Sequence, residues 1–242
     1  NWLAGQHQGW GGINITLQEC LVRQGPLWQV KPEEQNGPLP NLAKSWSWNA
    51  NKTSLTMNLV EGVKWSDGEP FDAEDLRFWW EDNVQDEKVT SRMPKDGMGV
   101  GTSMSVVDPY TIRFDFKEPQ GPARVSALAY IQGCPGPSHI LKDHHPRYNP
   151  QKTYEDYSNA QPADDLKNVV SLGMFVAVVH APDQIVIMRR NPYYWKVDEK
   201  GNQLPYMNEM HFKLSTWSDR TKQAVAGTGD FSNMENPGNY VE

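Results

Sequence analysis

An alternation of apolar and polar residues along the chain predicts β-strands. Over residues 55–59, two leucines and a methionine alternate with Thr and Asn, which is the two-residue period of a strand with one buried face. Over residues 111–116, the same period places Ile112, Phe114 and Phe116 on one side and charged residues on the other. This second pattern is typical of an antiparallel strand with one face in the core and one in solvent.

Three more strands are predicted toward the end of the sequence. Residues 174–180 and 184–190 are expected to form a β-hairpin, with Ala-Pro-Asp at 181–183 as its turn. Apolar residues alternate again over 210–214, so a further strand should follow the hairpin.

A helix is predicted to begin after Asp72. Its carboxylate can accept hydrogen bonds from the free amides of the first turn, and the acidic residues that follow suit the positive end of a helix dipole. Ala73, Leu76, Trp80 and Val84 recur at three- and four-residue spacing. They should therefore share the buried face of this helix.

Capping residues predict two other helices. Thr16 is expected to cap a helix over residues 17–22, and Ser218 a helix that runs to Ala226 and is closed by Gly227 and Gly229. Further short helices are expected within 121–129, from residue 140 and around 163–166.

The order of these elements resembles a known family. The residues that carry the match are Leu42, Ala43, Ser45, Trp46, Gly62, Val63, Lys64, Trp65, Ser66, Asp67, Gly68, Pro70, Ala73, Glu74 and Asp75, and later the runs 190–195 (RNPYYW) and 201–206 (GNQLPY). Together they resemble family 5 of the extracytoplasmic solute-binding proteins of ABC importers, which includes dipeptide, oligopeptide and nickel binders. A long string with intact spacing is more specific than a short motif.

The resemblance implies a fold and a division into domains. It implies an α/β fold with mixed α+β sheets, like the type II periplasmic binding proteins, and partial here because the matches cover only the amino-terminal part of the family. Residues 1–37 and 171–242 would form a discontinuous lobe I, and residues 38–170 an inserted accessory domain. The carboxy-terminal lobe is expected to be absent.

The resemblance also implies a function. The chain would belong to the substrate-binding component of an ABC importer, which captures an oligopeptide-type solute by hinge closure and delivers it to a membrane permease. An oligosaccharide ligand is the alternative within the family. The implied protein is an extracytoplasmic monomer with its export signal removed, either free in the periplasm or anchored at the cell surface as a lipoprotein.

Composition narrows the range of expected binding partners. The 242 residues carry a net charge of −7, and no basic cluster is longer than Arg189-Arg190, so a nucleic-acid partner is not expected. No apolar run approaches the roughly 20 residues of a membrane span. Ten tryptophans in a chain with a mean hydropathy of −0.70 argue for a folded protein.

The two cysteines, Cys20 and Cys134, lie far apart in the sequence and show no C-x-x-C spacing. Such a pair makes neither a disulfide framework nor a metal motif, so we expect two unpaired, partly buried thiols. A bridge between them would require an oxidising compartment.

The candidate ligand site is the early glycine-rich loop, which the resemblance places at the cleft between lobes. Trp10 offers a flat stacking face and one N–H donor, and its glycine neighbours let backbone approach a ligand closely. Gln8, Gly9 and Asn14 are its predicted companions. The alternative for Trp10 is ordinary packing.

No catalytic residue, metal or cofactor is predicted. Neighbouring carboxylates are expected in structural roles: Asp67 with Glu69 in a turn, Glu74 with Asp75 at a helix start, and Glu81 with Asp82 on a solvated helix face. The histidines at 139, 144 and 145 lack acidic or Cys partners at ligand spacing. The other tryptophans are expected in the core: Trp46, Trp48, Trp65, Trp79, Trp80 and Trp195.

Two other classes of function remain open at this point. A polysaccharide-acting enzyme or accessory module would draw on the tryptophans and on acids such as Asp67 and Glu69, although the acids show no glycosidase arrangement. A peptide-binding sensor would share the importer fold and differ only in having no permease partner.

Overall fold

The computed structural model describes residues 11–24, 37–89, 91, 93–129, 133–161 and 164–231. The helices are α1 (Gly11–Leu17), α2 (Ala73–Phe78), α3 (Ala123–Ser126), α4 (Ser138–Leu141), α5 (Tyr154–Asn159) and α6 (Trp217–Val225). The strands are β1 (Val22–Arg23), β2 (Leu39–Pro40), β3 (Ala43–Trp48), β4 (Ser54–Leu59), β5 (Ser103–Asp108), β6 (Thr111–Asp115), β7 (Phe175–Ala181), β8 (Ile185–Arg190) and β9 (Glu209–Lys213). Within the described ranges, no helix is long and apolar enough to cross a membrane.

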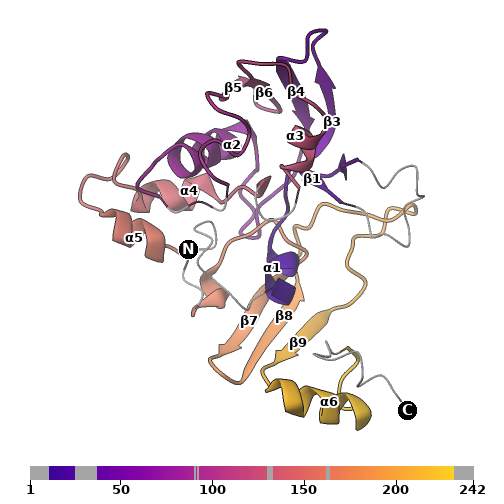
Figure 1. The fold of residues 1–242 in the computed structure, drawn as a ribbon. Coiled ribbons are helices and arrows are strands. Elements are labelled where there is room, and N and C mark those ends of the chain that lie inside the picture. Colours follow the sequence, from indigo (N-terminus) through magenta and orange to yellow (C-terminus); the bar gives the residue numbers. More distant parts are fainter. Residues whose placement is uncertain are drawn as a thin grey trace.

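The described elements gather around two larger sheets (Figure 1), and β1 and β2 form a third, two-stranded sheet. The first larger sheet is four-stranded and antiparallel, in the order β3-β4-β6-β5, with α2, α4 and α5 on the same half of the molecule. The second is a three-stranded sheet, β7-β8-β9, with α1 beside it and α6 beyond β9. The predicted mixed architecture is therefore confirmed, whereas the division at residues 37 and 170 stays a prediction.

The four-stranded sheet confirms both alternating patterns. Leu55, Met57, Ile112 and Phe114 are completely buried, and they lie opposite one another because β4 and β6 pair in register. Trp80 packs edge-on against Phe114 with ring centroids 5.4 Å apart. The predicted packing role of the tryptophans is confirmed: Trp65, Trp79 and Trp80 are buried in this core, and Trp46, Trp48 and Trp195 pack against it.

Helix α2 begins at Ala73, as predicted, with a reciprocal cap. The Asp72 side chain accepts a hydrogen bond from the Glu74 amide, and the Asp75 carboxylate accepts one from the Asp72 amide. Asp75 also accepts hydrogen bonds from Trp65 Nε1 and from the Ser138 amide. Burial raises the pKa of Asp75, although these hydrogen bonds act in the opposite direction. One carboxylate thus joins the turn before α2, the helix itself and α4.

The three-stranded sheet confirms the predicted hairpin. Strands β7 and β8 are joined by a tight turn in which Asp183 adopts a left-handed φ of 59°, a conformation that Asp tolerates better than most residues. Ile13 and Leu17 of α1 pack onto this sheet in a second buried cluster.

Two predicted helix starts are wrong. Helix α1 ends at Leu17 instead of a helix beginning there, and the Thr16 hydroxyl donates to the Ile13 carbonyl within α1. The following residues are extended because their backbone finds partners elsewhere: the Leu21 amide donates to the Gly133 carbonyl, and β1 pairs with β2. Helix α6 is capped by Thr216, not by Ser218. Its predicted closure at Gly227, with φ +64°, is confirmed.

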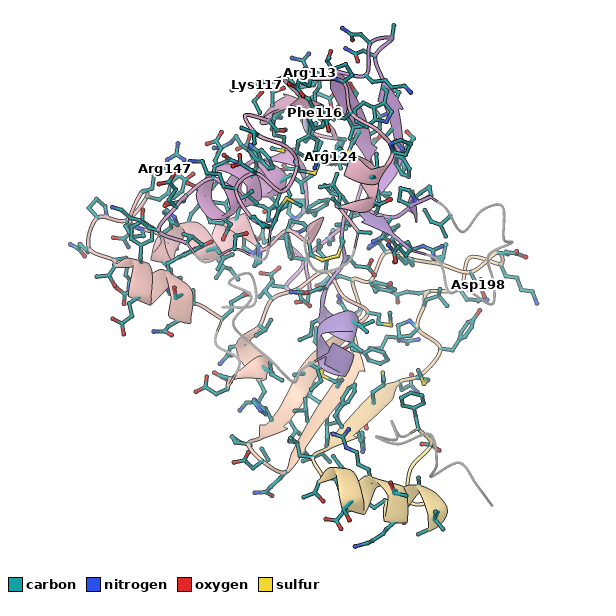
Figure 2. The ribbon with its side chains drawn as sticks, viewed as in Figure 1. Arg113, Phe116, Lys117, Arg124, Arg147 and Asp198 are labelled. Atoms are coloured by element: carbon teal, nitrogen blue, oxygen red, sulfur yellow. A yellow bond between two sulfur atoms is a disulfide. The ribbon has the colours of Figure 1, made fainter. Side chains whose placement is uncertain are left out.

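The expectation of two free thiols is also wrong, because Cys20 and Cys134 form a disulfide across 114 residues (Figure 2). The hydrogen bond from the Leu21 amide to the Gly133 carbonyl, 2.9 Å long, brings the two cysteines side by side. The distance between the two cysteines along the sequence does not predict this contact, because backbone pairing of their neighbours brings them together.

The prediction for Asp82 is wrong as well, because this residue is buried and not on a solvated face. Its carboxylate accepts hydrogen bonds from Arg147 Nη1 at 2.8 Å and from the Tyr148 hydroxyl at 2.6 Å (Arg147 is labelled in Figure 2). After Phe78 the helix widens into a π-helical turn, Trp79–Val84. This widening alters the 3.6-residue period. Asp82 is therefore buried as well, although Ala73, Leu76, Trp80 and Val84 are buried as predicted.

We predict that Asp82→Ala lowers the free energy of unfolding by about 2 kcal/mol, because it removes two hydrogen bonds that are made to a buried, charged acceptor. The matched control is Glu81→Ala. Glu81 also contacts Arg147 but is more exposed, so its loss should cost less than about 1 kcal/mol. Urea unfolding measures both changes. Equal losses in the two variants would contradict the assigned role of Asp82.

The buried side chain of His145 leads us to predict that the free energy of unfolding depends on pH. It is fully buried, Nδ1 accepts from the Arg147 amide, and Nε2 lies 3.6 Å from the Asp86 carboxylate. Burial lowers its pKa below the ordinary 6.5, although Asp82 and Asp86 act to raise it. The folded protein therefore binds fewer protons at this site than the unfolded chain, so its contribution is complete above pH 6.5 and is lost as the pH falls below that value.

The measurement is urea unfolding at about pH 7.5 and about pH 5, above and below the ordinary pKa of histidine. Between these two pH values, His145→Gln should lose less stability than the wild type does. His211→Gln, at a half-exposed histidine, should keep the wild-type slope. The same slope in the wild type and His145→Gln would contradict the prediction.

Candidate functional site

The four predicted ligand-site residues are not tested. Gln8, Gly9 and Trp10 lie outside the described residues, and Asn14 is placed only by its backbone, within α1. Helix α1 itself is firmly held, because Ile13 and Leu17 are buried against the β7-β8-β9 sheet. The prediction for these four residues stays a prediction.

A small pocket opens at the end of α1, and its interior volume of about 20 Å³ has room for about one water molecule. Three stretches of chain, distant in sequence, meet there with the side chains of Trp65 and Gln161. Its lining residues are Leu17, Gln18, Glu19, Trp65, Pro135, Gly136, Pro137, Gln161, Val169, Val170, Ser171 and Leu172.

The backbone around the pocket is tightly joined. A Cβ on Gly173 would lie 2.1 Å from the Thr16 carbonyl oxygen, so only glycine allows this approach. The Gly173 amide donates to the Leu17 carbonyl, which ties the segment before β7 to the end of α1. Ser171 is held to Ser66 by two hydrogen bonds, one from each residue's amide. The disulfide lies next to the pocket's 135–137 wall.

Glu19 is a buried residue that lines the pocket, and its carboxylate is fully engaged by partners within the protein. It accepts hydrogen bonds from the Asn41 amide at 2.7 Å and the Tyr194 hydroxyl at 2.6 Å, and it forms an ion pair with Lys196 at 2.8 Å. Burial, and then the neighbouring Glu19 charge, raise the pKa of Tyr194 well above its usual range. The carboxylate is therefore neutralised by its partners and faces the pocket without a free charge.

Lys196 reaches Glu19 from a well-ordered loop between β8 and β9. Asp198, labelled in Figure 2, accepts hydrogen bonds from the Lys200 and Asn202 amides and from the Tyr206 hydroxyl. These hydrogen bonds, led by that of the Asn202 side chain, lower the pKa of Asp198 to about 2. These contacts brace the loop from which Lys196 reaches Glu19.

Three polar atoms of the pocket's lining residues are buried without a hydrogen-bond partner: Gln18 Oε1, Gln161 Nε2 and Ser171 Oγ. Ser171 itself is 6% exposed. Gln161 adopts a left-handed φ of 54°, which is strained for a residue with a side chain. Buried polar groups in folded proteins almost always have a partner, so these three atoms together indicate a place where an added molecule supplies hydrogen bonds.

The carboxylates of Asp67 and Asp75, from two of the predicted pairs, are already engaged in contacts within the protein. Asp67 contacts His139 Nε2 at 2.8 Å and accepts from the Glu69 amide. Trp65, against which the His139 ring packs, is buried and donates to Asp75. Among the described residues, no group of His, Cys, Asp or Glu is arranged to hold a metal ion.

The sequence prediction did not single out Gln18, Gln161 or Ser171. Two of them are isolated glutamines in polar stretches, and neither stands in a motif. Ser171 lies just before β7 and also outside the matched segments. The fold, not local pattern, brings these side chains together.

The fold is a partial fold of the periplasmic binding protein type. The chain belongs to the bacterial extracellular solute-binding proteins of family 5, whose model (the family's middle region) matches residues 37–240. The resemblance predicted from the sequence is therefore confirmed.

Two relatives match the chain from end to end or nearly so. A periplasmic alpha-galactoside-binding protein of Rhizobium meliloti (strain 1021) is 53% identical over 100% of this chain and 35% of its own length. The periplasmic binding protein MelB of Agrobacterium fabrum C58, solved in complex with stachyose, is 51% identical with a TM-score of 0.91, over 99% of this chain and 36% of its own.

A third relative is more distant. The periplasmic oligopeptide-binding protein OppA of Escherichia coli (strain K12) is 24% identical over 65% of this chain and 29% of its own length. The chain thus spans about a third of the length of the relatives it matches.

We predict that Glu19→Ala lowers the free energy of unfolding by about 3 kcal/mol, because it leaves Lys196 and the Tyr194 hydroxyl without their buried partner. Glu61→Ala is the control, since Glu61 pairs with Lys44 on the surface and should contribute about 0–1 kcal/mol. Chemical denaturation of both variants measures the difference. A Glu19 variant as stable as the Glu61 variant would show that the carboxylate does not organise this junction.

Proposed function

We propose that this chain is part of the substrate-binding component of an ABC importer and that its ligand is an oligosaccharide of the α-galactoside type. The observation that carries the proposal is the relative named for α-galactoside binding, which is 53% identical across the whole chain. The stachyose complex of a second relative with a nearly superimposable fold supports the same ligand. In this proposal, the ligand is enclosed by hinge closure and passed to a membrane permease.

The expected oligopeptide ligand has weaker support than the oligosaccharide alternative. The oligopeptide-binding relative matches a smaller share of the chain at less than half the identity. We propose Gln8, Gly9, Trp10 and Asn14 as ligand contacts, with the Trp10 indole stacking on a sugar ring, since rings of this kind offer flat apolar faces.

An extracytoplasmic location fits both the relatives, which are periplasmic proteins, and the disulfide between Cys20 and Cys134. Disulfides persist in oxidising compartments such as the bacterial periplasm. The proposal assigns no catalysis, because Asp67 and Asp75 already serve His139, Trp65 and backbone amides. The protein is proposed to act as a monomer.

Isothermal titration calorimetry tests the proposal on the protein expressed at its natural length. We predict that stachyose binds with a Kd of about 1 μM or tighter, and that a neutral tetrapeptide at the same concentrations gives no heat above dilution. Tight peptide binding together with no stachyose binding would overturn the choice of ligand. Binding of neither ligand would overturn the proposal as a whole.

A further inference from the structure

The pocket at the end of α1 combines features that select a class of chemical group. Gln18 Oε1 is an acceptor, Gln161 Nε2 is a donor, and the Ser171 hydroxyl can serve as either. All three atoms lack a partner, and Ser171 is more than nine-tenths buried. A bound group that both donates and accepts hydrogen bonds satisfies this set, as a water molecule or a hydroxyl group does.

The pocket is electrically balanced. Among its lining residues, Glu19 is the ionisable one, and its carboxylate is already neutralised by Lys196 and two neutral donors. A charged group entering here would lose its water without gaining a partner of opposite sign, which is costly. Peptide termini carry such charges, whereas the hydroxyl groups of a neutral sugar do not.

The rest of the lining is apolar. Pro135, Pro137, Val170 and Leu172 surround the polar atoms. A pyranose ring has the matching character, with C–H groups on its faces and hydroxyl groups at its edge. The pocket has room for about one water molecule, and among these apolar residues only Val170 is partly exposed. The ring would therefore stay at the mouth, beside Val170, while one edge hydroxyl replaces water at the polar atoms, because a ligand hydroxyl reproduces the hydrogen bonds of the water it displaces.

We infer that this pocket is a subsite for one uncharged, hydroxyl-bearing end of the oligosaccharide, with Gln18, Gln161 and Ser171 as its specificity-determining residues. The inference rests on the proposed function and adds three residues to the proposed contacts Gln8, Gly9, Trp10 and Asn14. It also gives a physical reason for the preference over peptides: the subsite offers hydrogen bonds but no free charge.

The test is calorimetric titration of stachyose into the natural-length protein and its variants. Ser171→Ala and Gln18→Leu should each weaken the affinity by about three- to tenfold, the effect of one hydrogen bond lost from a buried site. Ser103→Ala and Gln223→Leu make the same chemical changes at exposed positions and should change the affinity by less than about twofold. Thermal unfolding of each variant confirms that it is folded.

Ser171→Thr provides a second, milder variant, which keeps the hydroxyl but fills the recess with a methyl group. It too should weaken stachyose binding. Wild-type affinity in Ser171→Ala, Ser171→Thr and Gln18→Leu would show that the pocket holds only water, and it would overturn the inference while leaving the proposed function standing. A wild-type protein that binds peptide but not stachyose would overturn the proposed function, and the inference with it.

Discussion

The buried carboxylate of Glu19 is the constraint on which the centre of this structure depends. It must be ionised to hold Lys196, and a buried charge is tolerated only when it is paired and hydrogen-bonded. Its partners come from two separate stretches: Asn41 before β3, and Tyr194 and Lys196 after β8. Satisfying one charge therefore fixes where the end of α1 lies relative to the four-stranded sheet and to the loop that follows β8.

The neighbouring contacts follow from that placement. Cys20, the next residue, bonds to Cys134 and so positions the 135–137 segment. Gly173 lies against the other side of the α1 end because it has no side chain. Between these two contacts the pocket remains open, lined by apolar residues and three polar atoms without partners. A charge that is satisfied within the protein thus leaves a neutral, hydrogen-bonding recess, the character expected for a sugar rather than for a peptide terminus.

Local patterns predicted most of the elements but few of the contacts between them. The strands at 55–59 and 111–116 could be predicted from the sequence, because a two-residue period reports burial directly. The Asp72 cap could also be predicted, because its side-chain oxygens act within one helical turn. The disulfide, the burial of Asp82 and the pocket residues depend on chain segments that meet only in the folded protein. No window along the sequence contains that information, and the true cap of α6 was missed because Thr216 and Ser218 are equally suitable by type.

The central claim is that a neutral oligosaccharide is held in part by the pocket at the end of α1. A crystal structure of the natural-length protein with stachyose tests it most directly. The account predicts a sugar hydroxyl within about 3.2 Å of Ser171 Oγ or Gln18 Oε1, with the ring at the mouth of the pocket beside Val170. Stachyose bound elsewhere, with only solvent in this pocket, would contradict the account.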